Sequence, residues 1–391
     1  MTAFTMTIFN DLTEKFPTSE ALFAYLKSPE GGSLVVRNES MNPEDPLVMI
    51  RYSKETSDMT VPHVPAFRSV VWDARANRPV SVSPSRGLAF SALPADATGF
   101  TVEEFVDGVM VNLFHYNGGW RLATRSNLDA TCNFYGTRNF NELFWETFNG
   151  AGLTEAHLDD RCVYSWVLQH PEERIVVAPA YGIPKLRLVT LSTIQDATVQ
   201  VLDIHSLTMP IPLKACVVDT HPLATVEDVK ERVTAWGKRY GADWQGLVVK
   251  TDGQRYKLRS NEYDEARHLR GNQAKRPYVW LERWSEGRLG AYLRLYKEED
   301  ADAWATVNSF KNLTQEVYDL YQRVYRRKEL RLGDAPQKYR KLLWDAHAAA
   351  SGAYFPALRD FMNKQDTARK LWLVNYEKRY GGLNAEVDPT D

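Results

Sequence analysis

The stretch EEFVDGVMVNLFHYNGGWRLATRSN, residues 103–127, decides how the N-terminal part of the chain folds. Its centre is the tripeptide NGG at residues 117–119, and these residue types readily adopt the positive φ angles of a tight hairpin turn. The segments on either side, VMVNLFHY and WRLATRS, are rich in β-branched and aromatic side chains. The pattern therefore predicts two antiparallel strands joined by a short turn.

Strand-like patterns continue on both sides of this hairpin. Before it, RSVVWDA is a short apolar run between turn signals. After it, RCVYSWVLQHPEERIVVAPAY predicts a strand, a polar turn at residues 170–173 and a second strand, and PKLRLVTLSTI and ATVQVLDI predict two more. WQGLVVKTDGQRYKLRS predicts another hairpin, turned at residues 251–253. One helix is expected to interrupt the strands, where Thr225 can cap VEDVKERVTAWGKRYG.

From about residue 273 the apolar spacing becomes helical. LTQEVYDLYQRVYRRKELR places Val317, Leu320, Tyr321 and Val324 on one helix face. Two later stretches are similar, and the second, DTARKLWLVNYEKRYGG, should stop at its Gly pair, with LNAEVDPTD as a frayed tail. We predict an α+β domain over residues 1–272, followed by an all-α domain over residues 273–391.

Composition limits the kinds of protein that this chain can be. Its 391 residues suit two domains, and no run approaches the ~20 apolar residues that cross a bilayer. The N-terminus has no leader-like pattern, and the three cysteines are too far apart for a metal site, so we expect a cytoplasmic protein without membrane partners. The net charge of −2 gives no global attraction for nucleic acid, but residues 271–380 hold 21 basic and 14 acidic side chains.

Several segments, taken in order, resemble the motifs of the covalent nucleotidyltransferase superfamily of ATP-dependent ligases and capping enzymes. FRSVVWD resembles the Arg-containing strand ahead of the active site, and FVDGVMVNLF occupies the place of the K-x-D-G motif. YSWVLQHPEERIVVAPAY resembles the third motif, QGLVVK the fourth, and RYKLRSNEY the last, with its two basic residues. The resemblance covers roughly residues 45–272 and is to the RNA ligases of the phage tRNA-repair kind in particular. It implies an antiparallel-sheet, ATP-grasp-like nucleotidyltransferase domain.

The resemblance also implies roles for individual residues. Those that would bind the nucleotide are Arg68, Gly108, Lys250, Lys257 and Arg259, and those that would take part in catalysis are Asp107 and Lys257. Cations projecting from a hairpin suit a polyphosphate, and Lys257 and Arg259 are two apart and so share one strand face. The same pair could instead lie on an exposed strand. An active enzyme of this kind would use ATP and Mg²⁺ to join RNA 5′-phosphate and 3′-hydroxyl ends.

Three positions depart from the family pattern. Phe105 stands where the family has the lysine that attacks ATP, and an aromatic ring has no lone pair to offer. Val167 and Gln245 stand where the third and fourth motifs have glutamate, which leaves the metal ligands unknown. We expect Phe105 to be a strand residue that fills the volume of a lysine stem and closes the floor of the pocket.

Three interpretations of these losses stay open. The chain is a ligase-like nucleotidyltransferase with self-adenylylation disabled or displaced, a catalytically inactive pseudo-ligase that binds nucleic acid or acts as a scaffold, or a noncovalent nucleotide sensor. A displaced nucleophile would come from Lys54, Lys185, Lys250 or Lys257. An enzyme that accepts pre-adenylylated RNA would need only the later steps.

A basic cluster in the helical part is a candidate RNA-binding surface. It contains Arg323, Arg326, Arg327 and Arg331, beside Tyr318 and Tyr325. Basic residues interleaved with aromatic ones can follow a nucleic-acid backbone while stacking on its bases. An ordinary solvated helix surface accounts for the same pattern.

Overall fold

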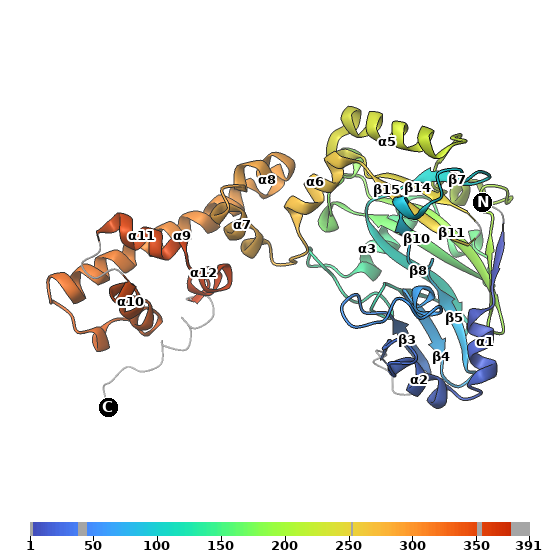
Figure 1. Ribbon diagram of the computed structural model, residues 1–391, viewed down its shortest axis with the longest axis horizontal. Coiled ribbons are helices and arrows are strands. Elements are labelled where there is room, and N and C mark those ends of the chain that lie inside the picture. The colour runs from blue at the N-terminus through green and yellow to red at the C-terminus, as the bar shows by residue number, and fades with distance from the viewer. Residues whose placement is uncertain (1–2, 38–44, 252, 350–353, 377–391) are drawn as a thin grey trace. The chain divides into compact units, whose positions relative to one another are not determined.

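The chain forms two compact units. The computed structural model describes residues 3–37, 45–251, 253–349 and 354–376. The first unit ends at His268 and the second begins at Leu269. All the strands lie in the first unit, and the described part of the second contains helices only (Figure 1). The expected mixture of helix and antiparallel sheet is confirmed.

The predicted hairpin around NGG, residues 109–123, lies in a six-stranded sheet with the order β1-β12-β11-β10-β8-β9 among the described residues. Every neighbouring pair in it is antiparallel. The hairpin turn has φ of +50° at Asn117 and +83° at Gly118, which confirms the prediction from NGG. The strands are β1 (Phe4–Met6), β8 (Val109–Tyr116), β9 (Gly119–Ala123), β10 (Cys162–Gln169), β11 (Lys185–Gln195) and β12 (Thr198–Leu202).

The second predicted hairpin lies in a five-stranded sheet with the order β13-β7-β14-β15-β6. Its strands are β6 (Leu88–Ala89), β7 (Thr101–Glu104), β13 (Thr220–His221), β14 (Gly246–Lys250) and β15 (Arg255–Arg259). Helix α5 (Val226–Tyr240) covers one face of this sheet (Figure 1). Thr225 caps the helix as predicted, because its side chain accepts a hydrogen bond from the Asp228 amide.

Strand alternation decides which residues of this sheet face away from α5. Leu247 and Val249 of β14 and Tyr256 of β15 pack in the same core as the apolar face of the helix. Successive side chains of a strand point to opposite faces. Val248 and Lys250, together with Arg255, Lys257 and Arg259, therefore lie on the opposite face.

Helices are more numerous in the first unit than the sequence indicated, and the expectation of a single helix there was wrong. Helices α1 (Ile8–Lys15) and α2 (Ser19–Lys27) share a core with a four-stranded antiparallel sheet. Helix α3 (Phe140–Gly150) buries three phenylalanines against the six-stranded sheet and begins at the cap residue Asn139. The remaining elements are β2 (Val35–Arg37), β3 (Leu47–Arg51), β4 (Val70–Asp73), β5 (Arg78–Val82), α4 (Ile211–Ala215) and α6 (Asn261–Arg270).

The strand predicted after the polar turn at residues 170–173 does not form. The turn is a 3-10 helix, Pro171–Glu173, and the chain beyond it forms no strand before β11, only a second 3-10 helix at Ala180–Gly182. The backbone amides of Val176 and Val177 both donate to the carboxylate of Asp107, each at 2.9 Å. Amides that donate hydrogen bonds to a buried carboxylate cannot also pair with a neighbouring strand. This explains why the apolar segment leaves the sheet.

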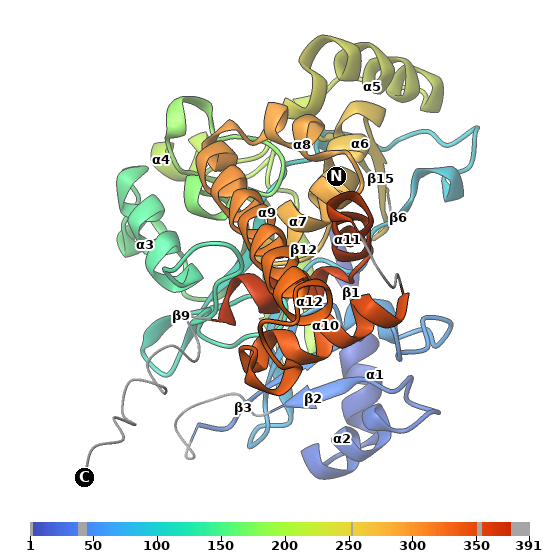
Figure 2. The same ribbon diagram turned by 90° about the vertical axis from the view of Figure 1, so that its left-hand side faces the viewer.

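The second unit packs around α9 (Asp300–Tyr321), which continues into a π-helical turn, Gln322–Arg326 (Figure 2). Its apolar side chains form one core with those of the surrounding helices. These helices are α7 (Arg276–Ser285), α8 (Leu289–Leu295), α10 (Gln337–Ala349), α11 (Phe355–Asn363) and α12 (Thr367–Val374). Within the described ranges, no helix is long and apolar enough to span a bilayer. The predicted Gly-pair stop and the tail lie outside the described residues.

Candidate functional site

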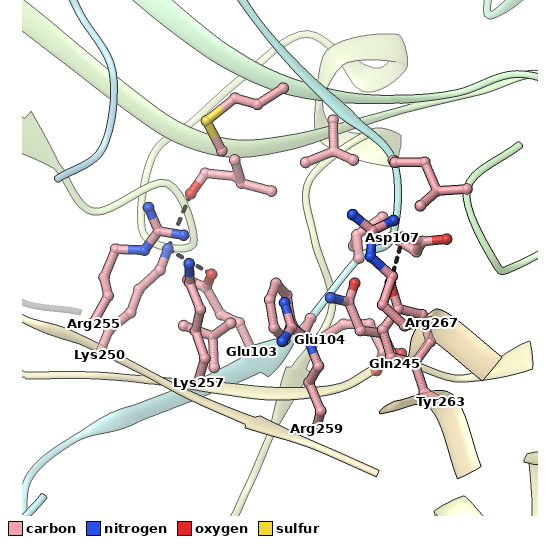
Figure 3. Close-up of a pocket in the computed structure, with 18 of the residues that line it drawn as sticks. Glu103, Glu104, Asp107, Gln245, Lys250, Arg255, Lys257, Arg259, Tyr263 and Arg267 are labelled. Carbon is pink, nitrogen blue, oxygen red and sulfur yellow. Dashed lines mark hydrogen bonds and ion pairs between the residues drawn. The ribbon is translucent and has the colours of Figure 1, made fainter. Parts of the chain in front are cut away.

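A cavity of about 240 Å³ lies between the five-stranded and six-stranded sheets of the first unit. Cationic side chains enter it from β14, β15 and α6, with Lys250, Arg255 and Lys257 close together at one end (Figure 3). Met110, Val167 and Val189 come from the opposing sheet and give it an apolar side. The cavity therefore has a polar side rich in cations and an apolar side.

The structure brings the predicted site residues of the first unit together at this cavity. They are Arg68, Phe105, Asp107, Gly108, Val167, Gln245, Lys250, Lys257 and Arg259. The sequence reasoning missed Glu103, Arg255, Tyr263 and Arg267, which line the same space. Arg255 could have been predicted from the sequence, because it lies two residues before Lys257 and therefore on the same strand face.

Two arginines at the cavity have buried nitrogen atoms without a hydrogen-bond partner among the described residues. Nη1 of Arg68 and both Nε and Nη1 of Arg255 are buried and have no hydrogen-bond partner among the described residues. Burial and the neighbouring Arg68 lower the pKa of Arg255 to about 10, and burial likewise lowers the pKa of Arg68. A buried charged donor without a hydrogen-bond partner is costly, so these atoms mark a site that an anion would stabilise.

Lys257 is the third cation in this group. Its Nζ lies 5.6 Å from the centre of the Phe105 ring, and the guanidinium carbon of Arg259 lies 5.3 Å from the same centre. Burial, followed by the charges of Arg255, Arg68 and Arg259, lowers the pKa of Lys257 to about 7. Burial and the positive charge around the amine thus favour its unprotonated form.

Glu103 and Glu104 of the cavity wall form their ion pairs with residues other than Arg68, Arg255 and Lys257. Glu103 lies 2.5 Å from Nζ of Lys250 and 3.0 Å from Nε2 of His205. Lys250 and His205 keep the pKa of Glu103 below its usual range even though burial works in the opposite direction. Glu104 pairs with His221 at 3.0 Å.

Lys250, which we expected to contact phosphate, is already occupied. Besides its ion pair with Glu103, its Nζ donates to the carbonyl of Val189 at 2.9 Å (Figure 3). Its side chain is buried. Arg259 also has an acidic partner, because its Nη1 lies 3.6 Å from Asp264 Oδ1. The excess positive charge of the cavity therefore resides on Arg68, Arg255 and Lys257 rather than on Lys250.

Asp107 holds the cavity wall in place. One carboxylate oxygen accepts the amides of Val176 and Val177, and the other accepts the Tyr263 hydroxyl at 2.7 Å (Figure 3). The carboxylate is buried and thereby ties the loop after β7 to α6 and to the segment after β10. Both oxygens are used, so the geometry accounts for Asp107 as a positioning residue.

The glycines of the two motif-like segments permit close backbone approach. Gly108 has φ of +151°, and a Cβ on it would lie 2.4 Å from the Leu168 carbonyl oxygen. Gly246 has φ of +142°, and a Cβ there would lie 2.1 Å from the Leu258 carbonyl oxygen. Both positions require glycine because the neighbouring backbone leaves no room for a side chain.

Phe105 lines the cavity, but the prediction that it is a strand residue was wrong. Strand β7 ends at Glu104, and Phe105 follows it with its amide donating to the Gly246 carbonyl at 3.0 Å. The half-buried Phe105 also lines a second cavity of about 260 Å³, which contains Lys185, Arg187 and Trp244. Residue 105 is therefore a wall shared by two cavities.

The residues of the cavity do not fit a divalent-cation site built from protein ligands. Within the described ranges, no group of three or more His, Cys, Asp and Glu side chains could hold a metal ion. Val167 is buried and apolar, and Oε1 of Gln245 is buried with no described hydrogen-bond partner. We therefore derive no step through a protein-bound metal.

The basic cluster of the second unit is exposed, but the tyrosines expected to stack on bases are not free. Tyr325 stacks on His347 with ring centres 3.9 Å apart, and Tyr318 packs against Phe355. Both rings contact the helical core, so the expected stacking role for them was wrong. Arg323, Arg326, Arg327 and Arg331 are exposed, and Arg326 lies 4.9 Å from the ring centre of Tyr354, which is 71% exposed.

Comparison with known proteins found distant similarity to ligases. No protein-family model matches the chain, and no curated protein matches it. It is similar to a solved archaeal ATP-dependent RNA ligase, with 14% identity and a TM-score of 0.39 over 77% of this chain and 78% of that one. A putative ATP-dependent DNA ligase from Aquifex aeolicus matches with 15% identity and a TM-score of 0.37, covering 77% and 81% of the two chains.

A third solved structure is an RNA ligase mutant from Naegleria gruberi with ATP and Mn. It has 14% identity and a TM-score of 0.35 over 55% of this chain and 68% of that one. The identities and TM-scores of all three are low. We therefore infer function from the geometry of the cavity.

Proposed function

We propose that the first unit is a ligase-like nucleotidyltransferase module that binds a nucleotide, with ATP as the expected ligand, in the cavity between its two sheets. The observation that carries this proposal is the unbalanced positive charge of Arg68, Arg255 and Lys257 on buried or half-buried side chains. Their burial is costly in the free protein. A polyphosphate would remove that cost by supplying several charge-assisted hydrogen bonds at once.

The apolar side of the cavity favours a nucleotide over a simple inorganic anion. Met110, Val167 and Val189 line the same space as the cations. A nucleoside triphosphate combines a flat base with a polyanionic chain and so complements both sides. Most ligand sites likewise pair an apolar wall with a few well-placed polar groups.

Adenylylation at residue 105 does not form part of this proposal, because phenylalanine has no nucleophilic atom. Noncovalent nucleotide binding is the property that the cavity supports without further assumptions. It is shared by a nucleotide sensor and by a ligase whose first step is displaced. ATP-dependent joining of RNA ends would be the activity if a different nucleophile served.

RNA is the second proposed partner, and the exposed arginines of the second unit favour it. Arg326 and Tyr354 present a cation and an exposed ring 4.9 Å apart. Such a pair can contact a phosphate and stack on a base, respectively. Binding of RNA by this surface does not depend on nucleotide binding by the first unit.

Equilibrium ATP binding to the purified full chain tests the main proposal. We expect Arg259→Met to weaken ATP binding about ten- to a hundredfold, the effect of losing one hydrogen bond to a charged group. Arg259 is exposed at the rim, so the variant should fold. The matched control is Arg239→Met, which removes an exposed arginine of α5 on the other side of the sheet. Failure of the wild-type protein to bind ATP, or equal binding by both variants, would exclude this cavity as the nucleotide site.

A further inference from the structure

Two lysines line the cavity, and Lys257 is the one whose amine forms no ion pair with a described residue. Lys250 is neutralised by Glu103, whereas Lys257 has no acidic partner among the residues that the structure describes. Lys54 does not line the cavity, and Lys185 is exposed at the second one. Of the four lysines considered as displaced nucleophiles, the geometry thus singles out Lys257.

The position of the Lys257 amine is defined by two contacts. A Cβ on Gly87 would lie 2.4 Å from Cε and 3.0 Å from Nζ of Lys257, so the lysine end occupies the space above this glycine. Residue 257 is held there because β15 pairs in parallel with β6, with Lys257 opposite Ala89. On the other side, Nζ faces the Phe105 ring at 5.6 Å from its centre.

The surrounding cations give this amine the properties of a nucleophile. An amine attacks only in its unprotonated form, and neighbouring positive charge favours that form. With its pKa lowered to about 7 by burial and the neighbouring cations, the Lys257 amine loses its proton far more readily than an ordinary lysine. An ordinary lysine at neutral pH would be almost entirely protonated.

We propose that Lys257 Nζ is a nucleophile toward the α-phosphorus of a nucleoside triphosphate bound in this cavity, a role that Phe105 cannot take. The inference rests on the proposed nucleotide binding. The arginines that flank Lys257 would hold the phosphates and offset the charge that develops on them as the bond forms. Phe105 then serves as the apolar wall that keeps the amine facing the cavity.

The reaction balances without any further reactant. The lone pair of Nζ forms an N–P bond, the bond from the α-phosphorus to the oxygen bridging to the β-phosphate breaks, and pyrophosphate leaves with that electron pair. The proton released by the nitrogen passes to pyrophosphate or water. The product is a phosphoramidate between Lys257 and the nucleoside monophosphate.

Labelling the full chain tests this inference. The protein is incubated with ATP labelled at the α-phosphate, with and without magnesium, and denatured at alkaline pH, because the phosphoramidate bond is acid-labile. We expect covalent label on the Lys257 peptide by mass spectrometry. Lys257→Arg should reduce the label by at least about a hundredfold, since a guanidinium stays protonated and does not attack. Lys54→Arg is the matched control and should label like the wild type.

Two further readouts separate a nucleophile from a residue that merely binds phosphate. Measured well below saturating ATP, where the rate reports the free protein, the labelling rate of the wild type should rise about tenfold per pH unit below pH 7 and level off above it, following loss of the amine proton. Gly87→Ala should lower the rate about tenfold without unfolding the protein, because the added methyl group displaces only the flexible end of Lys257.

The outcomes distinguish this inference from the proposed function. Three results would show that Lys257 is not the nucleophile while leaving nucleotide binding intact. The protein binds ATP but carries no label, it carries the label at another residue, or the Lys257→Arg variant is labelled as strongly as the wild type. If the protein does not bind ATP, both proposals are wrong.

Discussion

Replacing Lys257 with methionine should stabilise the protein in the absence of a ligand. Methionine matches the lysine stem in length and removes the amine that burial and three arginines force toward its neutral form. A residue that destabilises the free protein is expected at a binding site, where the ligand offsets the cost. The same change should weaken ATP binding, so stability and binding will move in opposite directions.

The size of the effect follows from the pKa. The drop from 10.5 to about 7 corresponds to about 5 kcal/mol at 1.36 kcal/mol per pKa unit. Because water reaches part of the half-buried side chain, we expect about 2 kcal/mol at pH 7, or about 4–8 °C in Tm for a unit of this size.

The pH dependence of stability independently checks the direction of the change expected for Lys257→Met. The folded-state pKa lies below that of the unfolded chain, so between about pH 7 and pH 10.5 the unfolded chain binds more protons. Wild-type stability due to this group therefore rises with pH across that window, and the methionine variant lacks this rise. The advantage of the variant should be largest at or below pH 7 and should shrink toward pH 9.

Thermal unfolding of both proteins from pH 6 to pH 9, with and without ATP, measures these differences. Lys230→Met is the control, because it removes an exposed lysine on α5 and should stay within about 0.5 kcal/mol of the wild type. An equal or lower Tm for Lys257→Met at pH 7 would show that the charge of the cavity is already neutralised. The basis for an anion site would then be lost.

Three further changes test other parts of the structure. Tyr263→Phe removes the donor to the buried Asp107 carboxylate and should lower the free energy of unfolding by about 1–3 kcal/mol in chemical denaturation; no change would mean that water replaces the hydroxyl. Replacing Arg326 and Arg327 together with alanine should weaken RNA binding and flatten its dependence on salt, as measured by titration at several salt concentrations; unchanged affinity would exclude this surface as the RNA site. Phe105→Lys alone should not produce joining of RNA ends in a gel assay, because Val167 and Gln245 still lack carboxylates; ligation by this single variant would show that those acids are dispensable.

The local elements of the sheets could be predicted from the sequence, since they depend on neighbours in the chain. NGG at residues 117–119 requires positive φ, and the structure has it at Asn117 and Gly118. The alternation in β15 places Lys257 and Arg259 on one face, as predicted. The cap of α5 at Thr225 was also readable, because a capping residue acts within one helical turn.

The balance of charge at the cavity was decided only by the tertiary structure. Lys250 and Lys257 resemble each other in sequence, yet Glu103 neutralises the first, while Arg255 and Arg68 surround the second. Likewise, Asp107 draws the amides of Val176 and Val177 out of a segment whose composition predicts a strand. Periodicity along a chain sets which way a side chain points. The charges and donors that it meets come from distant segments, and electrostatic interactions depend on distance in space rather than on separation in sequence.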